Sequence, residues 1–202
     1  MDAHAWDERY AASRQWSLTP NQFVAESLAD LVPGRALDLA CGEGRNAIWL
    51  AARGWSVTAL DFSAIGIDRG RAAAEEAGVH VDWVVGDALR HPLPEVDLVV
   101  VAYLQLAADE RRTAVRRAWE SLAPGGTFFL VAHDSTNLIE GTGGPQDASV
   151  LYTAEDVLTD LGSPDGVVRA GRVPRTVAPD DEHGGTQESV AWDALVHLVK
   201  GS

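Results

Sequence analysis

The sequence has few of the features that mark secreted, membrane-bound or nucleic-acid-binding proteins. Its 202 residues include a single cysteine, Cys41, so no disulfide can form within the chain and secretion gains no support. Only 16 residues are Lys or Arg, against 30 Asp or Glu, which gives a formal net charge of −14. Because nucleic acids and anionic membranes are bound through basic surfaces, this balance argues against both as partners and favours a small-molecule substrate.

Long apolar runs are missing as well. No stretch reaches the roughly 18 apolar residues that a membrane span needs, and the acidic start MDAHAWDERY lacks the apolar core of a signal peptide. We therefore expect a cytoplasmic protein, as a monomer or a homodimer. The chain has no internal repeat and no long linker, so we expect one domain overall, large enough to bury a sizeable core.

A clear pattern is present at residues 35–61, RALDLACGEGRNAIWLAARGWSVTALD. An apolar strand runs into a small-residue turn, Cys41 to Gly44, a helix follows from Arg45, and a second strand ends on Asp61. Glycines in such a turn let the backbone approach a ligand closely, and the helix start offers unpaired N–H groups. A carboxylate at the tip of the second strand accepts hydrogen bonds from both hydroxyls of a ribose. The pattern predicts a site for a nucleotide-type cofactor.

Residues 38–44, Asp-Leu-Ala-Cys-Gly-Glu-Gly, resemble the first motif of the class I S-adenosylmethionine-dependent methyltransferases, which usually reads acid-x-Gly-x-Gly-x-Gly. Ala40 stands in place of the first glycine. The continuation Gly44-Arg45-Asn46 is similar to the tellurite-resistance and thiopurine methyltransferase-like branch, and Leu-Ala-Pro-Gly-Gly at residues 122–126 is typical of the class. The resemblance implies S-adenosylmethionine as the cofactor, S-adenosylhomocysteine as its product, and a small-molecule methyl acceptor.

The fold that the resemblance implies is α/β, with a Rossmann-like, seven-stranded, mostly parallel sheet that contains one antiparallel strand and has helices on both faces. Residues 34–202 would form the methyltransferase core and residues 1–33 an N-terminal helical lid, within one domain overall. Apolar and alternating runs supply the strands after the first two. We expect them at residues 80–85, 97–104, 127–132, 167–177 and 188–200.

The resemblance also assigns roles within the cofactor site. Asp61 would hold the ribose, Phe62 would contact the adenine face, and Asp87, after the third strand, would take the adenine amino group. The remaining members lie in the lid, around the glycine turn, or at the ends of the next strands. The full expected cofactor set is Trp16, Asp38, Ala40, Cys41, Gly42, Gly44, Arg45, Asn46, Asp61, Phe62, Ser63, Asp87, Ala88, Leu89, Ala102 and Tyr103.

His133 is the candidate general base, because it follows the fifth expected strand and histidine is the usual proton acceptor near neutral pH. The adjacent Asp134 is not automatically its partner, since neighbours along a strand point to opposite faces. A glycine-containing loop at 138–150 follows. The residues expected to contact the acceptor are Tyr10, Tyr103, His133, Asn137 and Tyr152.

Other interpretations remain open. Gly42-x-Gly44-x-x-Ala47 also fits the dinucleotide fingerprint, so the chain can be an NAD(P)-dependent oxidoreductase, although that leaves Asp87 and the final pair of strands unexplained. A non-catalytic protein that binds a nucleotide cofactor is the second alternative. The histidines lack ligand spacing, so no metal site is expected. Four arginines at positions 111, 112, 116 and 117 of an expected helix are interpreted as a solvated face.

Overall fold

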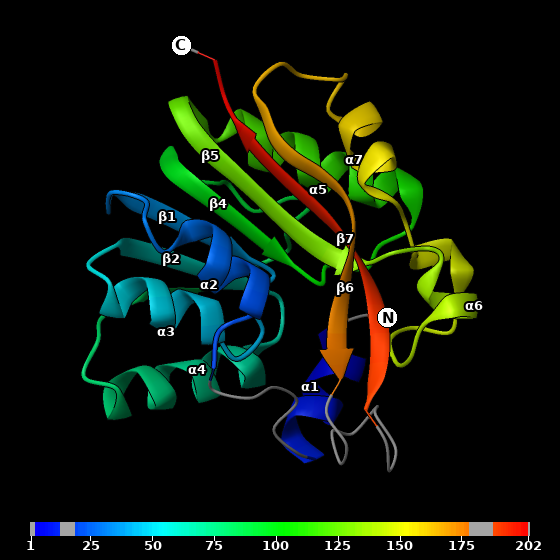
Figure 1. Cartoon of the computed structure of the whole chain (residues 1–202). Helices are drawn as coiled ribbons and strands as arrows, with labels where there is room; N and C mark the ends of the chain where they lie inside the picture. Colours follow the sequence, from blue (N-terminus) through cyan, green and yellow to red (C-terminus); the bar gives the residue numbers. More distant parts are fainter. Residues whose placement is uncertain (1–2, 13–18, 178–187, 202) are drawn as a thin grey trace.

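The structure, a computed structural model, describes residues 3–12, 19–177 and 188–201. Its centre is a seven-stranded sheet in which β1 to β5 are parallel, β7 is antiparallel to β5, and β6 is antiparallel to β7. This arrangement confirms the predicted fold class (Figure 1). In spatial order the strands are β3 (Asp82–Val85), β2 (Ser56–Asp61), β1 (Arg35–Leu39), β4 (Val96–Ala102), β5 (Leu122–His133), β7 (Ser189–Val199) and β6 (Val167–Val177).

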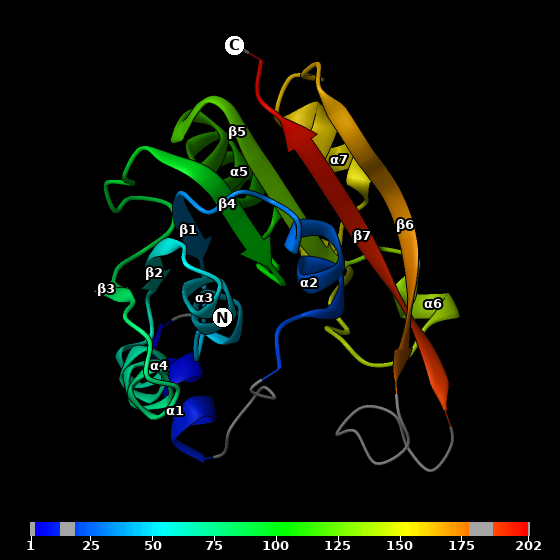
Figure 2. The same ribbon diagram turned by 60° about the vertical axis from the view of Figure 1, so that its left-hand side comes forward.

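Helices cover both faces of this sheet (Figures 1 and 2). The side chains of α2, α3 and α4 pack on one face, and those of α5 and α7 pack on the other. The helices are α1 (Ala3–Ala12), α2 (Gln22–Leu28), α3 (Arg45–Ala52), α4 (Ala64–Glu76), α5 (Ala108–Glu120), α6 (Asn137–Glu140) and α7 (Ala154–Asp160), with a 3-10 turn at Ala148–Val150. In the described part of the chain, no helix is long and apolar enough to cross a membrane.

Strand β4 shows why the sheet is buried on both sides. Its apolar run alternates between the two cores: Leu98 and Val100 pack under α2, α3 and α4, whereas Val99 and Val101 pack under α5 and α7. All four side chains are fully or almost fully buried, as expected for a strand at the centre of a parallel sheet.

The order of the strands determines where a ligand can bind. The chain builds outward from β1 to β2 and β3, and then returns to the other side of β1 with β4 and β5. At such a switch point the connections leave in opposite directions, and a crevice opens at the carboxyl ends of the strands. The residues that follow β1, β2, β4 and β5 all lie at this edge.

The arginines of α5 form the solvated face that the sequence suggests only in part, since Arg112 and Arg116 are exposed and the other two are not. Arg111 is buried, and its Nε donates to Asp160 Oδ2 at 2.7 Å. Arg112 Nε donates to the other oxygen of Asp160 at 3.2 Å, and Arg116 Nε donates to the backbone carbonyl of Asp160 at 2.6 Å. The prediction was wrong for Arg111, because α7 packs against α5 there and this contact cannot be seen in the sequence of α5 alone.

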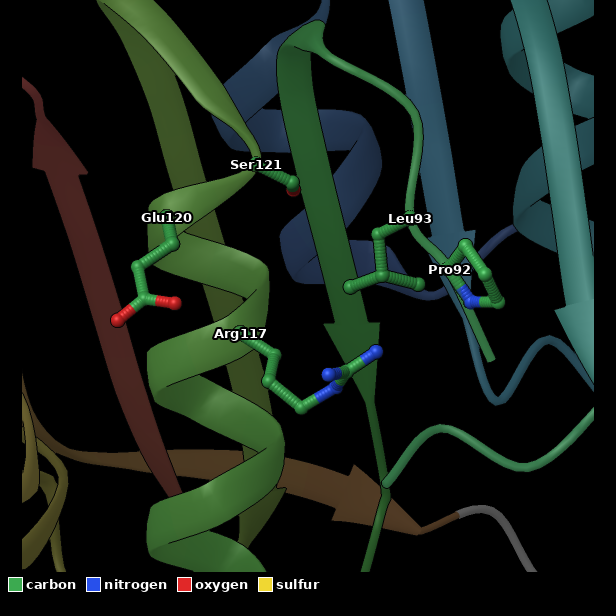
Figure 3. Close-up of a pocket in the computed structure, with 5 residues that line it drawn as sticks. All are labelled: Pro92, Leu93, Arg117, Glu120 and Ser121. Carbon is green, nitrogen blue, oxygen red and sulfur yellow. The ribbon is translucent and has the colours of Figure 1, made fainter. Parts of the chain in front are cut away.

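Arg117 holds a different segment. Its guanidinium donates to the backbone carbonyls of Ala88 at 3.3 Å and His91 at 2.5 Å, so that α5 is tied to the loop before β4. Figure 3 shows Arg117 extending from α5 toward Pro92 and Leu93, beside a pocket of about 330 Å³. The residues that line this pocket are not among those that line the larger cleft at the carboxyl edge.

Candidate functional site

A cleft of about 1590 Å³ runs along the carboxyl ends of the strands. One end of it, which we name the loop end, is formed by Asp38, Ala40, Gly42, Asp61 and Asp87. The opposite end, the hairpin end, is formed by Tyr103, His133 and Arg175, with Asp193 buried behind them. The predicted residues that line the cleft are Tyr10, Asp38, Ala40, Cys41, Gly42, Arg45, Asn46, Asp61, Phe62, Asp87, Ala88, Leu89, Ala102, Tyr103 and His133.

The loop end is held together by hydrogen bonds from backbone amides to Asp61. Its Oδ2 accepts from the amide of Gly42 at 2.8 Å, and its Oδ1 accepts from the amide of Ser63 at 2.9 Å. These two bonds fix the plane of the carboxylate and join the turn after β1 to the end of β2. Burial raises the pKa of Asp61, although the amides of Ser63 and Gly42 oppose this rise.

The turn after β1 is left-handed at three positions, Ala40, Gly42 and Gly44. Ala40 has φ of +59° and Gly42 has φ of +57°. Glycine adopts this region freely, whereas an L-residue with a Cβ is strained there by roughly 1–2 kcal/mol. The glycine that the family usually has at position 40 would therefore suit the observed backbone.

Asp38 lies beneath this turn. Its Oδ2 accepts a hydrogen bond from the amide of Ala47 in the first turn of α3 at 3.0 Å. Burial raises the pKa of Asp38 to about 7, against the opposing effects of the Ala47 amide and the positive charge of Arg45. The loop end therefore contains a carboxyl group that changes charge near neutral pH.

Gly44 and Ser63 support the loop end without lining the cleft. Gly44 is the N-cap of α3 with φ of +73°, and a Cβ there would lie 2.2 Å from Cη2 of Trp83. Ser63 is the N-cap of α4, because its hydroxyl accepts from the amide of Gly66 at 3.0 Å and donates to Asp7 in α1. Both residues shape the helices that begin beneath the cleft.

Asp87 lies on the adjoining wall of the cleft. Its Oδ1 accepts from the amide of Leu89 at 2.8 Å, which turns the chain sharply after β3. The side chain is 45% exposed, so it remains accessible from the cleft.

The hairpin end, with Asn21 included, is assembled from side chains of five separate segments. The Tyr103 hydroxyl donates to Asp193 Oδ2 at 2.7 Å and accepts from Asn21 Nδ2 at 3.2 Å. Arg175 Nε donates to the same oxygen of Asp193 at 2.8 Å. Tyr103 itself has φ of +60°, a strained conformation for a non-glycine residue and one that is concentrated at functional sites.

Charges at the hairpin end shift two pKa values. Burial alone would raise the pKa of Asp193, but the contacts with His133, Arg175 and Tyr103 outweigh it and hold this pKa below its usual value. The pKa of Tyr103 is raised, first by burial and then by the negative charge of Asp193. Asp193 is therefore a carboxylate and Tyr103 a neutral hydrogen-bond donor.

Asp193, Arg175 and Asn21 were missed in the sequence analysis. One signal was available: Asp193 is an acid within the otherwise apolar run of β7, AWDALVHLV, and a buried charge requires partners. No comparable signal marks Asn21, which caps α2 through bonds from the amides of Phe23 and Val24.

The structure does not bring Asn137 and Tyr152 into the cleft. Asn137 is buried; its Nδ2 donates to the carbonyl of Gly143 at 2.9 Å and its Oδ1 accepts from the amide of Trp192 at 2.7 Å. The buried Tyr152 hydroxyl donates to the carbonyl of Leu104 at 2.8 Å. Both side chains thus hold loops together. Trp16 lies outside the described residues.

Two other kinds of chemistry, catalysis by a cysteine nucleophile and metal binding, are not supported by this site. The Cys41 thiol is buried, and burial raises its pKa well above the usual value, which does not suit a nucleophile. Over residues 3–12, 19–177 and 188–201, no three His, Cys, Asp or Glu side chains are grouped so as to hold a metal ion.

Comparison with known proteins identifies the domain. Residues 36–126 match a family model described as a methyltransferase domain. The chain is 36% identical over 120 residues to the tRNA 5-carboxymethoxyuridine methyltransferase of Escherichia coli strain K12, a match that covers 55% of this chain and 46% of that protein. It is 30% identical over 112 residues to a ubiquinone biosynthesis O-methyltransferase of Klebsiella pneumoniae, covering 54% and 46%. The chain spans about half the length of the curated relatives it matches.

Solved structures share the whole fold. TehB from Haemophilus influenzae superposes with a TM-score of 0.76 at 17% identity, covering 96% of this chain and 67% of that one. The N-methyltransferase NodS from Bradyrhizobium japonicum, in complex with S-adenosylhomocysteine, gives a TM-score of 0.73 at 21% identity, covering 99% and 98%. The predicted methyltransferase domain is confirmed by the family match, and the chain shares its fold with TehB and NodS.

Proposed function

We propose that the chain catalyses methyl transfer from S-adenosylmethionine to a small-molecule acceptor. The observation that carries this proposal is the continuity of the cleft, in which Asp61 and Asp87 line the same space as Tyr103 and His133. Its volume of about 1590 Å³ exceeds the roughly 300–1,000 Å³ of an ordinary small-molecule pocket, so a nucleoside cofactor leaves room for an acceptor beside it.

The residues of the loop end fit S-adenosylmethionine. Asp61, oriented by two amides, faces the cleft with lone pairs that suit the ribose hydroxyls. We assign Phe62 to the adenine face and Asp87, with Ala88 and Leu89, to the adenine amino group. The residues assigned to the methionine end are Asp38, Ala40, Cys41, Gly42, Arg45 and Asn46.

When it is bound, the cofactor supplies a methyl group on a positively charged sulfur. The chain has to orient the acceptor and exclude water, because positioning accounts for most of the catalysis of such a displacement. We assign Tyr10, Tyr103 and His133 to the acceptor, since all three line the cleft.

We also propose that the segment before residue 34 covers this site as a lid, with the core beginning at residue 34. Trp6 and Tyr10 of α1, together with Thr19 to Gln22, line the cleft. Tyr10 is buried, and its ring would meet a Cβ placed on Gly66 of α4 at 3.2 Å, so α1 packs closely against α4.

The curated relatives include proteins named for a tRNA substrate and for ubiquinone biosynthesis, so they favour no single class of acceptor. The charge of this chain does favour one. A net charge of −14 opposes the approach of RNA, whose phosphates require basic partners. A small acceptor is therefore the better fit.

Calorimetric titration of the purified chain with S-adenosylhomocysteine, NAD and NADP tests the cofactor assignment. We expect micromolar binding of S-adenosylhomocysteine alone, whereas binding of a dinucleotide alone would favour the oxidoreductase. The acceptor class is tested with S-adenosylmethionine labelled on its methyl group, incubated with total tRNA and, separately, with a protein-free small-molecule extract. Label in the extract is expected; label in tRNA would contradict the small-molecule assignment.

A further inference from the structure

A pair of side chains at the hairpin end is aligned by the register of the sheet. His133 in β5 lies directly opposite Asp193 in β7, so both side chains are on the same face of an antiparallel pair. His133 Nδ1 lies 3.4 Å from Asp193 Oδ1. The two side chains are 12% and 0% exposed, and within the described part of the chain these two buried atoms have no hydrogen-bond partner. Each is the nearest candidate partner of the other.

The other oxygen of the Asp193 carboxylate already has two hydrogen-bond donors. This oxygen, Oδ2, accepts from the Tyr103 hydroxyl at 2.7 Å and from Arg175 Nε at 2.8 Å. These two donors restrain the carboxylate and leave Oδ1 without a donor among the described residues, 3.4 Å from Nδ1 of the histidine. A buried carboxylate oxygen with no donor is costly, so a hydrogen bond to Nδ1–H would stabilise this arrangement.

The His133 ring has two close neighbours. The centroid of the Tyr103 ring lies 4.8 Å away. The backbone of Gly144 is so close that a Cβ there would lie 2.9 Å from Cγ of His133. These neighbours restrict the ring, and because both nitrogens belong to one rigid planar ring, fixing Nδ1 also fixes the direction of Nε2.

We propose that Asp193 is a positioning residue that holds His133 in the Nδ1–H tautomer, so that Nε2 serves as the general base toward the methyl acceptor. This inference rests on the proposed function and adds to it a class of acceptor, one whose attacking atom carries a proton that must be removed, as a hydroxyl oxygen does. A distance of 3.4 Å fits a pair that closes to a full hydrogen bond once the site is occupied.

The reaction balances without a further reagent. The acceptor O–H bond breaks and its proton goes to His133 Nε2, while an oxygen lone pair forms the new O–CH₃ bond. The electron pair of the breaking S–CH₃ bond stays on sulfur and gives neutral S-adenosylhomocysteine. The imidazolium that results lies beside the carboxylate of Asp193, which stabilises its charge.

Other charges also surround His133. Arg175 from β6 shares the Asp193 carboxylate, Arg45 from α3 lines the same cleft, and Tyr103 contributes a neutral hydroxyl. Asp193 is the one of these groups with an oxygen that lies 3.4 Å from Nδ1 and can accept a hydrogen bond from its proton, so it can select the tautomer.

The test is to observe the two ring nitrogens of His133 by NMR in the full chain labelled with ¹⁵N-histidine, with and without S-adenosylhomocysteine. His133→Gln identifies the signal. We expect the pyrrole-type shift at Nδ1 and the pyridine-type shift at Nε2 in the neutral wild type. In Asp193→Asn, Tyr103 and Arg175 retain the amide oxygen and the NH₂ group faces Nδ1, so the two shifts should exchange between the nitrogens.

Asp160→Asn is the matched control, because Asp160 is a buried carboxylate with arginine partners outside the cleft. It should leave the His133 spectrum unchanged. The proposal would be overturned if His133 of the wild type were in the Nε2–H form, or in the mixture of tautomers that free imidazole shows. This result can be obtained from the wild type even if Asp193→Asn fails to fold. An unchanged tautomer in folded Asp193→Asn would also overturn it. Failure of the proposed function would show separately, as absent S-adenosylhomocysteine binding with an intact tautomer.

Discussion

At the loop end of the cleft, polar contacts run from carboxylates to backbone amides that lie near them in sequence, whereas at the hairpin end they run between side chains that lie far apart. Asp61 accepts from amides 2 and 19 residues away, and Asp38 from one 9 residues away. Tyr103 bonds to side chains that are 82 and 90 residues away. The first kind of site is fixed by local chain geometry and the second by the packing of the whole sheet.

This difference suits two tasks. For an invariant nucleoside, carboxylates can be held in one place by backbone amides, which a substitution does not remove. An acceptor that differs from one enzyme to another is better served by side chains, which a substitution readily changes. Under the proposed function, the loop end would therefore bind the cofactor and the hairpin end would select the acceptor.

The largest expected effect that distinguishes the two ends is a dependence of the free energy of unfolding on pH, which arises from Asp38 at the loop end. Its pKa of about 7 lies above the usual value of 3.8, so the folded state holds a proton that the unfolded state has released. Stability from this group is complete at low pH and is lost as pH rises toward 7. Between pH 5 and 8, the free energy of unfolding should fall by roughly 3 kcal/mol from this residue. Urea unfolding at both pH values measures it, and Asp38→Asn should remove the difference; an equal fall in the variant would contradict the assignment.

Removal of the Asp61 carboxylate should weaken S-adenosylhomocysteine binding by roughly 100-fold or more, because charge-assisted bonds to the ribose and the anchor of the turn are both lost. Calorimetry measures the affinity. Asp97→Ala is the matched control, since Asp97 pairs with Arg35 at the opposite edge of the sheet and does not line the cleft. Equal affinity for wild type and Asp61→Ala would show that the loop end is not the cofactor site.

At the hairpin end, Tyr103→Phe should lower the free energy of unfolding by about 1–2 kcal/mol, because Asn21 and Asp193 each lose a hydrogen-bond partner. Binding of S-adenosylhomocysteine should change less than about threefold, since this hydroxyl is engaged within the hairpin end. Chemical denaturation and calorimetry on the same preparation separate the two effects. Tyr152→Phe, which loses a single bond to Leu104, is the comparison variant. A large loss of affinity in Tyr103→Phe would mean that the two ends are not independent.

The smallest effect is expected at Ala40. Glycine would relieve the left-handed strain at φ of +59° but would add freedom to the unfolded chain, and the two terms are each about 1 kcal/mol. Ala40→Gly should therefore change stability by less than about 1 kcal/mol and leave cofactor affinity unchanged. Thermal unfolding measures the first quantity. A loss above about 2 kcal/mol would show that the methyl group of Ala40 makes a contact that matters.

The same contrast explains what could be predicted from the sequence. The strand, turn and helix around Gly42, and the acid at position 61, are adjacent in sequence and have a short-range physical cause, so the fold class and the loop end were accessible. The partnership of His133 with Asp193 depends on the register of two strands 60 residues apart, which no local pattern encodes. Asn137 follows β5 at the carboxyl edge as expected, yet the amide of Trp192 and the carbonyl of Gly143 occupy its polar atoms.

The pairing of β7 with β5 also means that the face on which Asp193 lies depends on whether its position in β7 is odd or even. Odd-numbered positions around Asp193, such as Leu195, face the core under α2 and α3, whereas even-numbered Ala194 and Val196 face the core under α5 and α7. One residue inserted into β7 would exchange the two sets and direct a carboxylate into the apolar side of the sheet, whereas two inserted residues would preserve the faces. The number of residues between Asp193 and Val199 can therefore change only in even steps while an acid remains beside His133.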